Sequence, residues 1–227
     1  MNNVRNELPA AGTRRYTQLP RFFRWFSNHC VLRQLDDDDV ARIVPALAHP
    51  DFARCWGGAA PRTEAEVAEF VRNATSEWQR GTRYLMAVVR KQSHDLVGWV
   101  ELRAIEKGAW MVRWFIQPHF AGRDIAREML VAAADLMFTA LDAQKLYANC
   151  PPGHLLFESL LNGASFIELV PAGSLDHVTG QPRRQSLYEL GQHDWKALNK
   201  ARGQAAGAVS AAVAWLGTGQ RAELALV

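Results

Sequence analysis

The stretch "FIQPHFAGRDIAREML", Phe115–Leu130, combines the end of an apolar strand, a short glycine loop and the start of an amphipathic helix. A helix N-terminus offers unpaired N–H donors and the positive end of the helix dipole. Glycine lets the backbone approach a phosphate without a Cβ in the way. This order predicts an anion site over residues 122–127, although Asp124 places a negative charge in the loop.

The bulk properties limit the class of protein. The chain has 227 residues, of which 48% are hydrophobic and 22% charged, so one sizeable domain with tails is expected. A net charge of +3 is too small to indicate nucleic-acid binding. Cys30, Cys55 and Cys150 have no metal spacing, and their odd number argues against a disulfide framework and favours the reducing cytoplasm. The N-terminus lacks the apolar core of a signal peptide, and the longest late apolar segment is too short to span a membrane.

In the first third of the domain, the sequence contains clear signals for the ends of helices and strands. "HCVLRQL" alternates like a strand, and Asp36–Asp39 follow it. Acidic residues favour a helix start, so we expect a helix here, bent or ended near Pro45, and no metal site. A second helix begins at Thr63, with Glu66 completing a capping box, and ends before Gly81.

The remaining elements follow at short intervals. Three strands, "RYLMAVVRK", "LVGWVELRAI" and "AWMVRWFIQP", have short connections and are expected to be antiparallel. A helix at about 124–141, a strand "KLYANC", a helix "HLLFESLLNGA" and two closing strands complete the order β-α-α-β-β-β-α-β-α-β-β. We expect this domain to cover residues 28–192. An N-terminal extension (1–27) would precede it, and an Ala-rich helical tail (193–227) could pack on the domain or form a homodimer.

This order resembles the GNAT superfamily of acyl-CoA N-acyltransferases, and most of all the bacterial ribosomal-protein N-terminal acetyltransferases. "VLRQLDDDDVARI", "WFIQPHFAGRDIAREML" and "SLYELGQHDW" are similar to their opening strand, cofactor loop and closing strand. The resemblance implies an α/β (α+β) fold with a mixed, mostly antiparallel sheet of about seven strands flanked by helices. It also implies that acetyl-CoA lies where the fourth and fifth strands of that fold splay apart.

The resemblance further implies which residues meet the cofactor. The backbone of residues 115–117 would pair with the pantetheine arm, and residues 122–127 would hold the phosphates. The candidate cofactor-binding residues are Phe115, Ile116, Gln117, His119, Gly122, Arg123, Asp124, Ile125, Ala126 and Arg127.

The loop departs from the family pattern, which is usually Gln/Arg-x-x-Gly-x-Gly/Ala. Here His119 stands first and Asp124 last. A carboxylate close to a pyrophosphate is repelled by it. Asp is also a strong N-cap, so Asp124 could bond the N–H of Ala126 or Arg127 and fill the site with its own anion. Whether it does so or the loop tolerates it is left open by the sequence.

Direct acyl transfer to an amine needs a group that takes a proton from the amine and an acid for the thiolate. Glu101, on the strand face opposite Val100 and Leu102, is the candidate base. His154 could act as acid or base. It stands with Phe157 where the family often has Asn-x-x-Ser, and Leu161 replaces the tyrosine that often protonates the thiolate.

Two functions follow from these features. The first is an acetyl-CoA-dependent N-acetyltransferase acting on a primary amine, either a protein N-terminus or a small molecule. The second is a degenerate GNAT-fold protein with lost or altered CoA binding that acts as an interaction module. Cys150, at a strand end, is expected to be a buried hydrophobic residue and not a nucleophile.

Overall fold

The computed structural model describes residues 16–50, 52, 61–120, 122–175, 181–182 and 184–200. The chain divides into two units, residues 1–190 and 191–227, and each is considered by itself. In the second unit the described part is the end of the last strand and a helical segment at 192–200. The Ala-rich remainder of the expected tail, with the dimer contact expected of it, lies outside the described residues.

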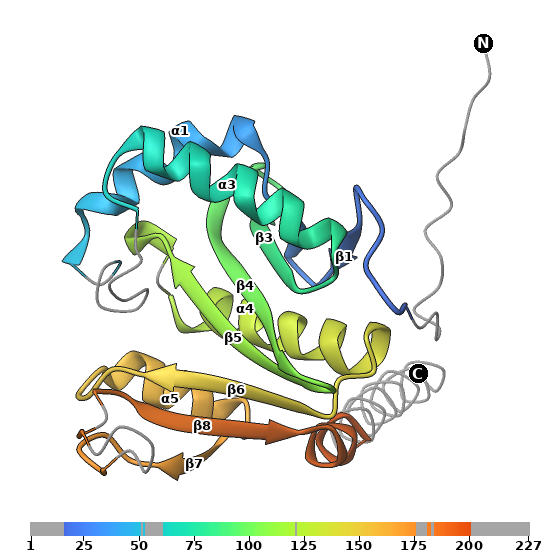
Figure 1. The fold of residues 1–227 in the computed structure, drawn as a ribbon, viewed down its shortest axis with the longest axis vertical. Coiled ribbons are helices and arrows are strands. Elements are labelled where there is room, and N and C mark those ends of the chain that lie inside the picture. The colour runs from blue at the N-terminus through green and yellow to red at the C-terminus, as the bar shows by residue number, and fades with distance from the viewer. Residues whose placement is uncertain are drawn as a thin grey trace, which may run out of the picture. The chain divides into compact units, whose positions relative to one another are not determined.

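An eight-stranded sheet forms the centre of the first unit, in the order β1-β2-β3-β4-β5-β6-β8-β7 (Figure 1). Its strands are β1 (Arg24–Phe26), β2 (Cys30–Gln34), β3 (Arg83–Arg90), β4 (Leu96–Glu106), β5 (Ala109–Ile116), β6 (Lys145–Cys150), β7 (Ile167–Val170) and β8 (Ser186–Gly191). The pairs from β1 to β5 and the β7–β8 pair are antiparallel, whereas β5 and β6 are parallel. The predicted mixed, mostly antiparallel α/β fold is therefore confirmed, and β1 is an additional strand inside the segment 1–27.

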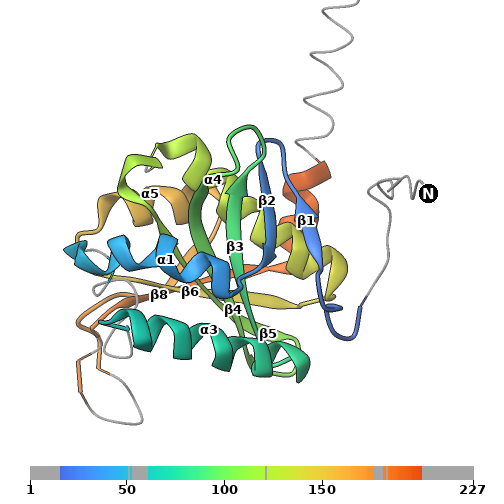
Figure 2. The ribbon, with the colours of Figure 1, turned by 90° about the horizontal axis from the view of Figure 1, so that it is seen from above.

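Helices cover both faces of this sheet. They are η1 (Asp37–Asp39), α1 (Val40–Ile43), η2 (Val44–Ala48), α3 (Glu64–Gln79), η3 (Pro118–Phe120), α4 (Arg123–Asp135), the π-helical η4 (Leu136–Ala140) and α5 (Leu155–Gly163). Seen from above, α1 and α3 lie on one side of the sheet and α4 and α5 on the other (Figure 2). We call these sides the α3 face and the α4 face.

The capping signals determine where α3 begins and ends. The Oγ1 of Thr63 accepts a hydrogen bond from the N–H of Glu66 at 3.2 Å, and the Glu66 carboxylate accepts one from the N–H of Thr63 at 3.3 Å. After the last turn, Gly81 adopts φ +69°, a conformation that glycine reaches without strain. The predicted boundaries of this helix are confirmed.

Apolar residues of α1 and α3 pack on the α3 face of the sheet. The core there joins residues of three strands to those of the helices, and includes Val67, Val71, Leu85, Ala87, Trp99 and Phe115. Leu85 lies opposite Glu101 and Ala87 opposite Trp99 in the β3–β4 ladder. Because side chains alternate along a strand, Glu101 shares the α3 face with Trp99.

The two parallel strands separate before they end. The register between β5 and β6 runs from Ala109 opposite Lys145 to Val112 opposite Ala148. Beyond that point β5 continues to Ile116 and β6 to Cys150. A rise of about 3.3 Å per residue makes the remaining part of β5 about 13 Å long. We call the region between the diverging strand ends the split; η3 and the start of α4 follow the open end of β5.

Candidate active site

The start of α4 is open to an anion. Gly122 is its N-cap, in an extended conformation (φ −64°, ψ 142°), and a Cβ built on Gly122 would meet nothing within 4 Å. Neither packing nor backbone strain therefore requires a glycine here. A small residue at this position keeps the approach to the helix N–H groups clear.

Asp124 does not cap its own helix. Its side chain is exposed, and the carboxylate makes no hydrogen bond or ion pair with any residue that the structure describes. The N–H of Ala126 bonds instead to the carbonyl of Gly122 at 3.2 Å. Of the two alternatives that the sequence leaves open, capping of the Ala126 N–H by Asp124 is not seen, and Arg123 to Ile125 are the first helical N–H donors.

A buried aromatic stack borders the split on the α4 face. Trp114, on β5 beyond the last β5–β6 pair, stacks on Phe157 of α5 with ring centroids 4.7 Å apart. Trp114 is only 2% exposed, and its indole N–H has no hydrogen-bond acceptor among the described residues. A buried donor without an acceptor is costly, so this N–H is available to a ligand that enters the split.

The residues before the glycine loop continue the sheet. Phe115 packs in the core of the α3 face, 4.8 Å between ring centroids from Trp99. The N–H of Gln117 bonds to the carbonyl of Val97 at 2.8 Å, so pairing with β4 persists to this residue. Exposed His119, in η3, lines a separate hollow with residues of α1 and of the β3–β4 turn. The structure therefore brings Phe115, Ile116 and Gln117 to the edge of the split, and His119 to a neighbouring hollow.

Glu101 lies in a buried ionic cluster on the α3 face and is 1% exposed. Its Oε1 lies 2.6 Å from Nε of Arg83 and 3.2 Å from Nη2 of Arg103. Its Oε2 lies 3.5 Å from Nε of Arg113 and accepts no hydrogen bond among the described residues. The expected face is confirmed, but Glu101 is surrounded by guanidinium groups and not solvated.

The three arginines were not identified from the sequence. Arg83 faces Arg103 in the β3–β4 ladder, and Glu101 faces Arg113 in the β4–β5 ladder. Arg83 also bonds Glu77 of α3 at 2.7 Å. Cross-strand register, once the hairpins are aligned, places all of them on one face and is the signal that could have found them. Arg113 immediately follows Val112, so the cluster adjoins the point where the split begins.

His154 caps α5. Its Nδ1 accepts a hydrogen bond from the N–H of Phe157 at 3.4 Å, which assigns the proton of the neutral ring to Nε2. Because α5 lies on the α4 face, His154 and Glu101 are on opposite sides of the sheet (Figure 2). The structure thus does not bring the two candidate catalytic residues together. Leu161 is fully buried and has no acidic proton to give.

The two cysteines that the structure describes are buried, as expected of residues with a structural role. Cys150 is 1% exposed and its thiol donates to the carbonyl of Pro151 at 3.6 Å. Cys30 is fully buried, and burial, followed by the charge of Glu128, raises the pKa of its thiol to about 11. Both are free thiols. Cys55 lies outside the described residues.

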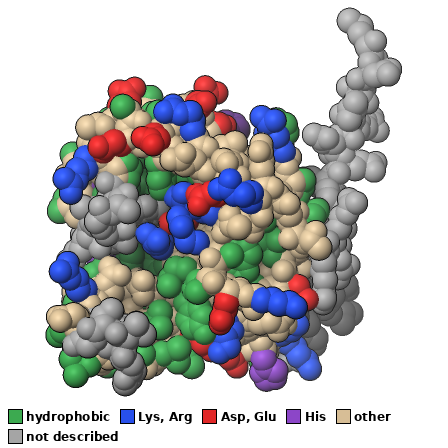
Figure 3. All heavy atoms as spheres, viewed as in Figure 1, with side chains coloured by type: hydrophobic (Ala, Val, Ile, Leu, Met, Phe, Trp, Pro, Cys, Tyr) green, Lys and Arg blue, Asp and Glu red, His purple; other side chains and the backbone are tan. Residues whose placement is uncertain are grey.

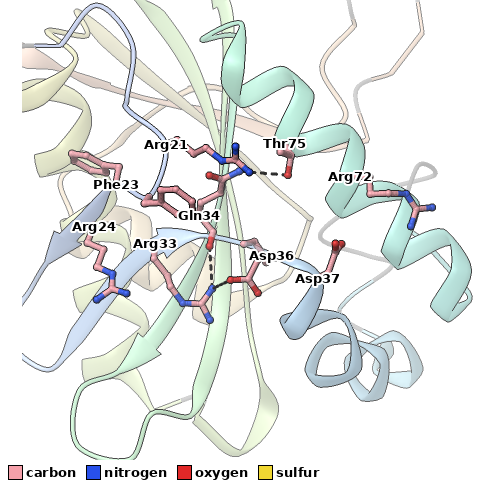
Figure 4. Close-up of a pocket in the computed structure, with 11 residues that line it drawn as sticks. Arg21, Phe23, Arg24, Arg33, Gln34, Asp36, Asp37, Arg72 and Thr75 are labelled. Atoms are coloured by element: carbon pink, nitrogen blue, oxygen red, sulfur yellow. Dashed lines mark hydrogen bonds and ion pairs between the residues drawn. The ribbon is translucent and has the colours of Figure 1, made fainter.

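The acidic run Asp36–Asp39 is structural. Asp36 and Asp39 form a capping box at η1, and the guanidinium of Arg33 holds buried Asp39 through two contacts of 2.6 and 2.8 Å. Figure 4 shows Arg33 directed at Asp36 within a hollow of about 340 Å³, between β2 and α3, where Arg72 also lies. In the part of the chain that the structure describes, no group of His, Cys, Asp or Glu residues could hold a metal ion.

No helix among the described residues has the length and apolarity needed to cross a membrane.

Comparison with solved structures shows the same fold in many proteins. Among them are a GNAT-family acetyltransferase from Bacillus anthracis (12% identity, 75% of this chain and 99% of that chain, TM-score 0.64) and the ribosomal-protein-S5-alanine acetyltransferase from Vibrio fischeri (17%, 76% and 98%, 0.59). A third is spermidine N-acetyltransferase from Vibrio cholerae in complex with CoA and spermine (20%, 74% and 98%, 0.61). No curated protein matches the chain. The family model of the acetyltransferase (GNAT) domain matches residues 29–161, and the chain therefore belongs to the GNAT family of acetyltransferases.

Proposed function

We propose that the chain transfers an acetyl group from acetyl-CoA to a primary amine by direct attack of the amine. One observation carries this proposal: the β5–β6 ladder ends at Val112 and Ala148, and the strand edge beyond it leads to the open N-terminus of α4. In this arrangement an extended ligand could lie in the split, with its anionic end at the start of α4. The family membership supports the same reading.

The residues present fit acetyl-CoA. The N–H groups of residues 123–125 would hold its phosphates, and Gly122 would leave them room, since nothing in the fold fills the space of a Cβ there. The buried indole N–H of Trp114 would donate to a carbonyl oxygen of the arm in the split. When bound, the group supplies a thioester whose acyl carbon the amine attacks.

Glu101 is the proposed acceptor of the amine proton. Its Oε2 is the carboxylate oxygen that accepts no hydrogen bond among the described residues, whereas Oε1 is in contact with Arg83 and Arg103. A carboxylate fixed by two guanidinium groups keeps one orientation, which favours a productive amine geometry. Leu161 cannot protonate the leaving thiolate, so His154, whose Nε2 bears the proton of the neutral ring, is the proposed acid on the α4 side.

The acceptor is a primary amine of either a protein N-terminus or a small molecule. The Vibrio fischeri relative is described as acting on a ribosomal protein and the Vibrio cholerae relative on spermidine. We also propose that the protein is cytoplasmic, because its three cysteines, an odd number, argue against a disulfide framework and favour a reducing compartment.

The test is calorimetric titration of the purified full chain with acetyl-CoA and with CoA, followed by two glycine variants. Gly122→Val adds a branched side chain where the phosphates would lie, and we expect acetyl-CoA binding to weaken by about tenfold or more. Gly163→Ala is the matched control. Gly163 is also exposed, and a Cβ there also meets nothing within 4 Å, but it lies at the far end of α5.

The alternative is an interaction module that has lost CoA binding. It predicts no heat of binding at millimolar acetyl-CoA for the wild-type chain, and this result would refute the proposal. Equal affinities for the wild-type chain and Gly122→Val would place the cofactor elsewhere than at the start of α4. The unfolding free energies of both variants, measured in urea, check that the fold is intact.

A further inference from the structure

The ionic cluster on the α3 face, made of Glu77, Arg83, Glu101, Arg103 and Arg113, has more basic than acidic groups. Among the described residues, these are three guanidinium groups and two carboxylates. Figure 3 shows basic side chains, with acidic ones among them, gathered near the middle of this face. Other acidic and basic side chains surround the cluster toward the edges of the same view (Figure 3).

The arginines of the cluster differ in exposure. The Arg83 side chain is 6% exposed and lies over the ring of Phe70, 4.6 Å from its centroid, so it is part of the core. The side chains of Arg103 and Arg113 are 43% and 30% exposed. The Nε and Nη2 of Arg103 both point to one oxygen of Glu101, at 3.3 and 3.2 Å. A guanidinium group has five N–H donors, so Arg103 keeps donors that face solvent.

The cluster lies beside the closed end of the split, where the acyl group of the donor would lie. Arg113 follows the last β5–β6 pair, and Glu101 is its partner in the β4–β5 ladder. An acyl group reaching the closed end of the split from the α4 side would meet an amine arriving from the α3 face. The amine would therefore approach beside Oε2 of Glu101, with Arg103 and Arg113 next to it.

We propose that the acceptor carries an anionic group, a carboxylate or a phosphate, near its amine, and that Arg103 and Arg113 bind that group. Two arginines beside a carboxylate match a molecule with a negative and a positive group: the anion takes the guanidinium donors, and the amine takes Oε2 of Glu101. The same charges disfavour a polyamine, because its second ammonium group would face the guanidinium groups. This inference rests on the proposed function and narrows its acceptor class.

The test uses acceptors that share one four-carbon chain. γ-Aminobutyrate, butylamine and putrescine carry a negative, a neutral and a positive group at the second end. Phosphoethanolamine and ethanolamine form a second pair that differs by a phosphate. Comparing the gain in this pair with that of γ-aminobutyrate over butylamine distinguishes phosphate recognition from carboxylate recognition. CoA release with acetyl-CoA as donor gives kcat/KM for each. We expect the acidic members to exceed their neutral partners by about tenfold or more, and putrescine to be the poorest.

The variants Arg103→Gln and Arg103→Lys separate recognition from folding. Arg103→Gln is expected to lower kcat/KM for the acidic acceptors about tenfold more than for butylamine, whose own decrease measures the support that Arg103 gives to Glu101. For the acidic acceptors, kcat/KM of Arg103→Lys should lie between that of the wild-type chain and that of Arg103→Gln. Lysine keeps the positive charge but lacks the planar guanidinium group that can donate two parallel hydrogen bonds. Arg24→Gln removes an exposed arginine from β1, at the far edge of the sheet, and is the matched control.

Calorimetry with γ-aminobutyrate and phosphoethanolamine in the absence of acetyl-CoA keeps this inference separate from the proposed function. Binding of either acidic amine that Arg103→Gln weakens and Arg24→Gln does not would support the anion site even if acetyl-CoA fails to bind. A preference for butylamine or putrescine would overturn the inference, as would equal losses in the two glutamine variants or no Arg103-dependent binding. A separate titration of the same proteins with acetyl-CoA reports on the proposed function alone.

Discussion

Removing the Glu128 carboxylate should loosen α4 from the sheet. Glu128 reaches from α4 to the turn between β1 and β2. Its carboxylate accepts hydrogen bonds from Ser27 Oγ (2.5 Å), from the backbone N–H groups of His29 (2.6 Å) and Cys30 (3.1 Å), and contacts Nδ1 of His29 (2.7 Å). The contacts to Ser27 and Cys30 are partly buried and those to His29 are exposed. At about 1.5 kcal/mol for each partly buried bond to a charged acceptor, and little for the exposed ones, Glu128→Ala should lower the free energy of unfolding by about 3 kcal/mol.

The same contact makes stability depend on pH. Partial burial alone would raise the pKa of Glu128, but the hydrogen bonds from Ser27, His29 and Cys30 outweigh it, and the pKa is lowered from 4.5. The stabilisation is then fully present above the pKa of the unfolded state and is lost as the pH falls through the folded value. Glu128→Gln should keep the shape, lose part of the stability at pH 7 and show a smaller fall in stability on acidification.

Urea unfolding at neutral and acidic pH, followed by tryptophan fluorescence, measures both effects. A double-mutant cycle with Ser27→Ala isolates the pair, and the coupling energy should be about 1 kcal/mol. A loss below about 1 kcal/mol for Glu128→Ala at pH 7 would refute the reasoning. So would an acid dependence that is the same for the wild-type chain and Glu128→Gln.

Three further predictions follow from single residues. Asp124→Asn should tighten acetyl-CoA binding by up to roughly fivefold at low ionic strength, and less in high salt, because it removes an exposed charge near the proposed phosphate site; calorimetry at two salt concentrations tests this, and weaker binding would contradict it. Gly98→Ala should cost about 2 kcal/mol or more in urea unfolding, because its Cβ would lie 2.1 Å from a backbone oxygen of β5. Cys30, with a pKa of about 11, should resist alkylation at pH 8 in the folded chain and react readily in urea, as peptide mass spectrometry can measure.

Local signals predicted most of the fold because they act over a few residues. Thr63, Glu66 and Gly81 mark both ends of α3 by short-range hydrogen bonding and backbone conformation, and the structure agrees with them. β1 escaped prediction because it has three residues, too few for an alternating pattern, and forms by pairing with β2. The split was expected from the resemblance and not from the residues, since no local pattern of β5 or β6 requires them to diverge.

The candidate site was predictable in position but not in environment. Strand alternation placed Glu101 on the correct face, yet its ion pairs are with arginines from two other strands, one of which also pairs with Glu77 of α3, and only the tertiary structure assembles them. The sequence left open whether Asp124 caps α4, because Asp is a strong N-cap. In the structure the N-cap is Gly122 and the helix begins at Arg123, so Asp124 is the second helical residue and not the cap.

In the proposed reaction, the two faces of the sheet would have different roles. On the α4 face, backbone N–H groups at the start of α4 and the indole of Trp114 are suited to a phosphorylated, amide-containing donor, and none of them is a charged side chain. On the α3 face, Glu101 and its arginines are suited to a charged acceptor. The split would connect them, because it runs from the start of α4 at its open end to Val112 and Ala148, where the ladder ends and Arg113 follows. Glu101 and His154 therefore need not touch: Glu101 would take the proton of the amine as the C–N bond forms, and His154 would give a proton to the sulfur as the C–S bond breaks. A change in acceptor preference should then leave donor affinity unchanged.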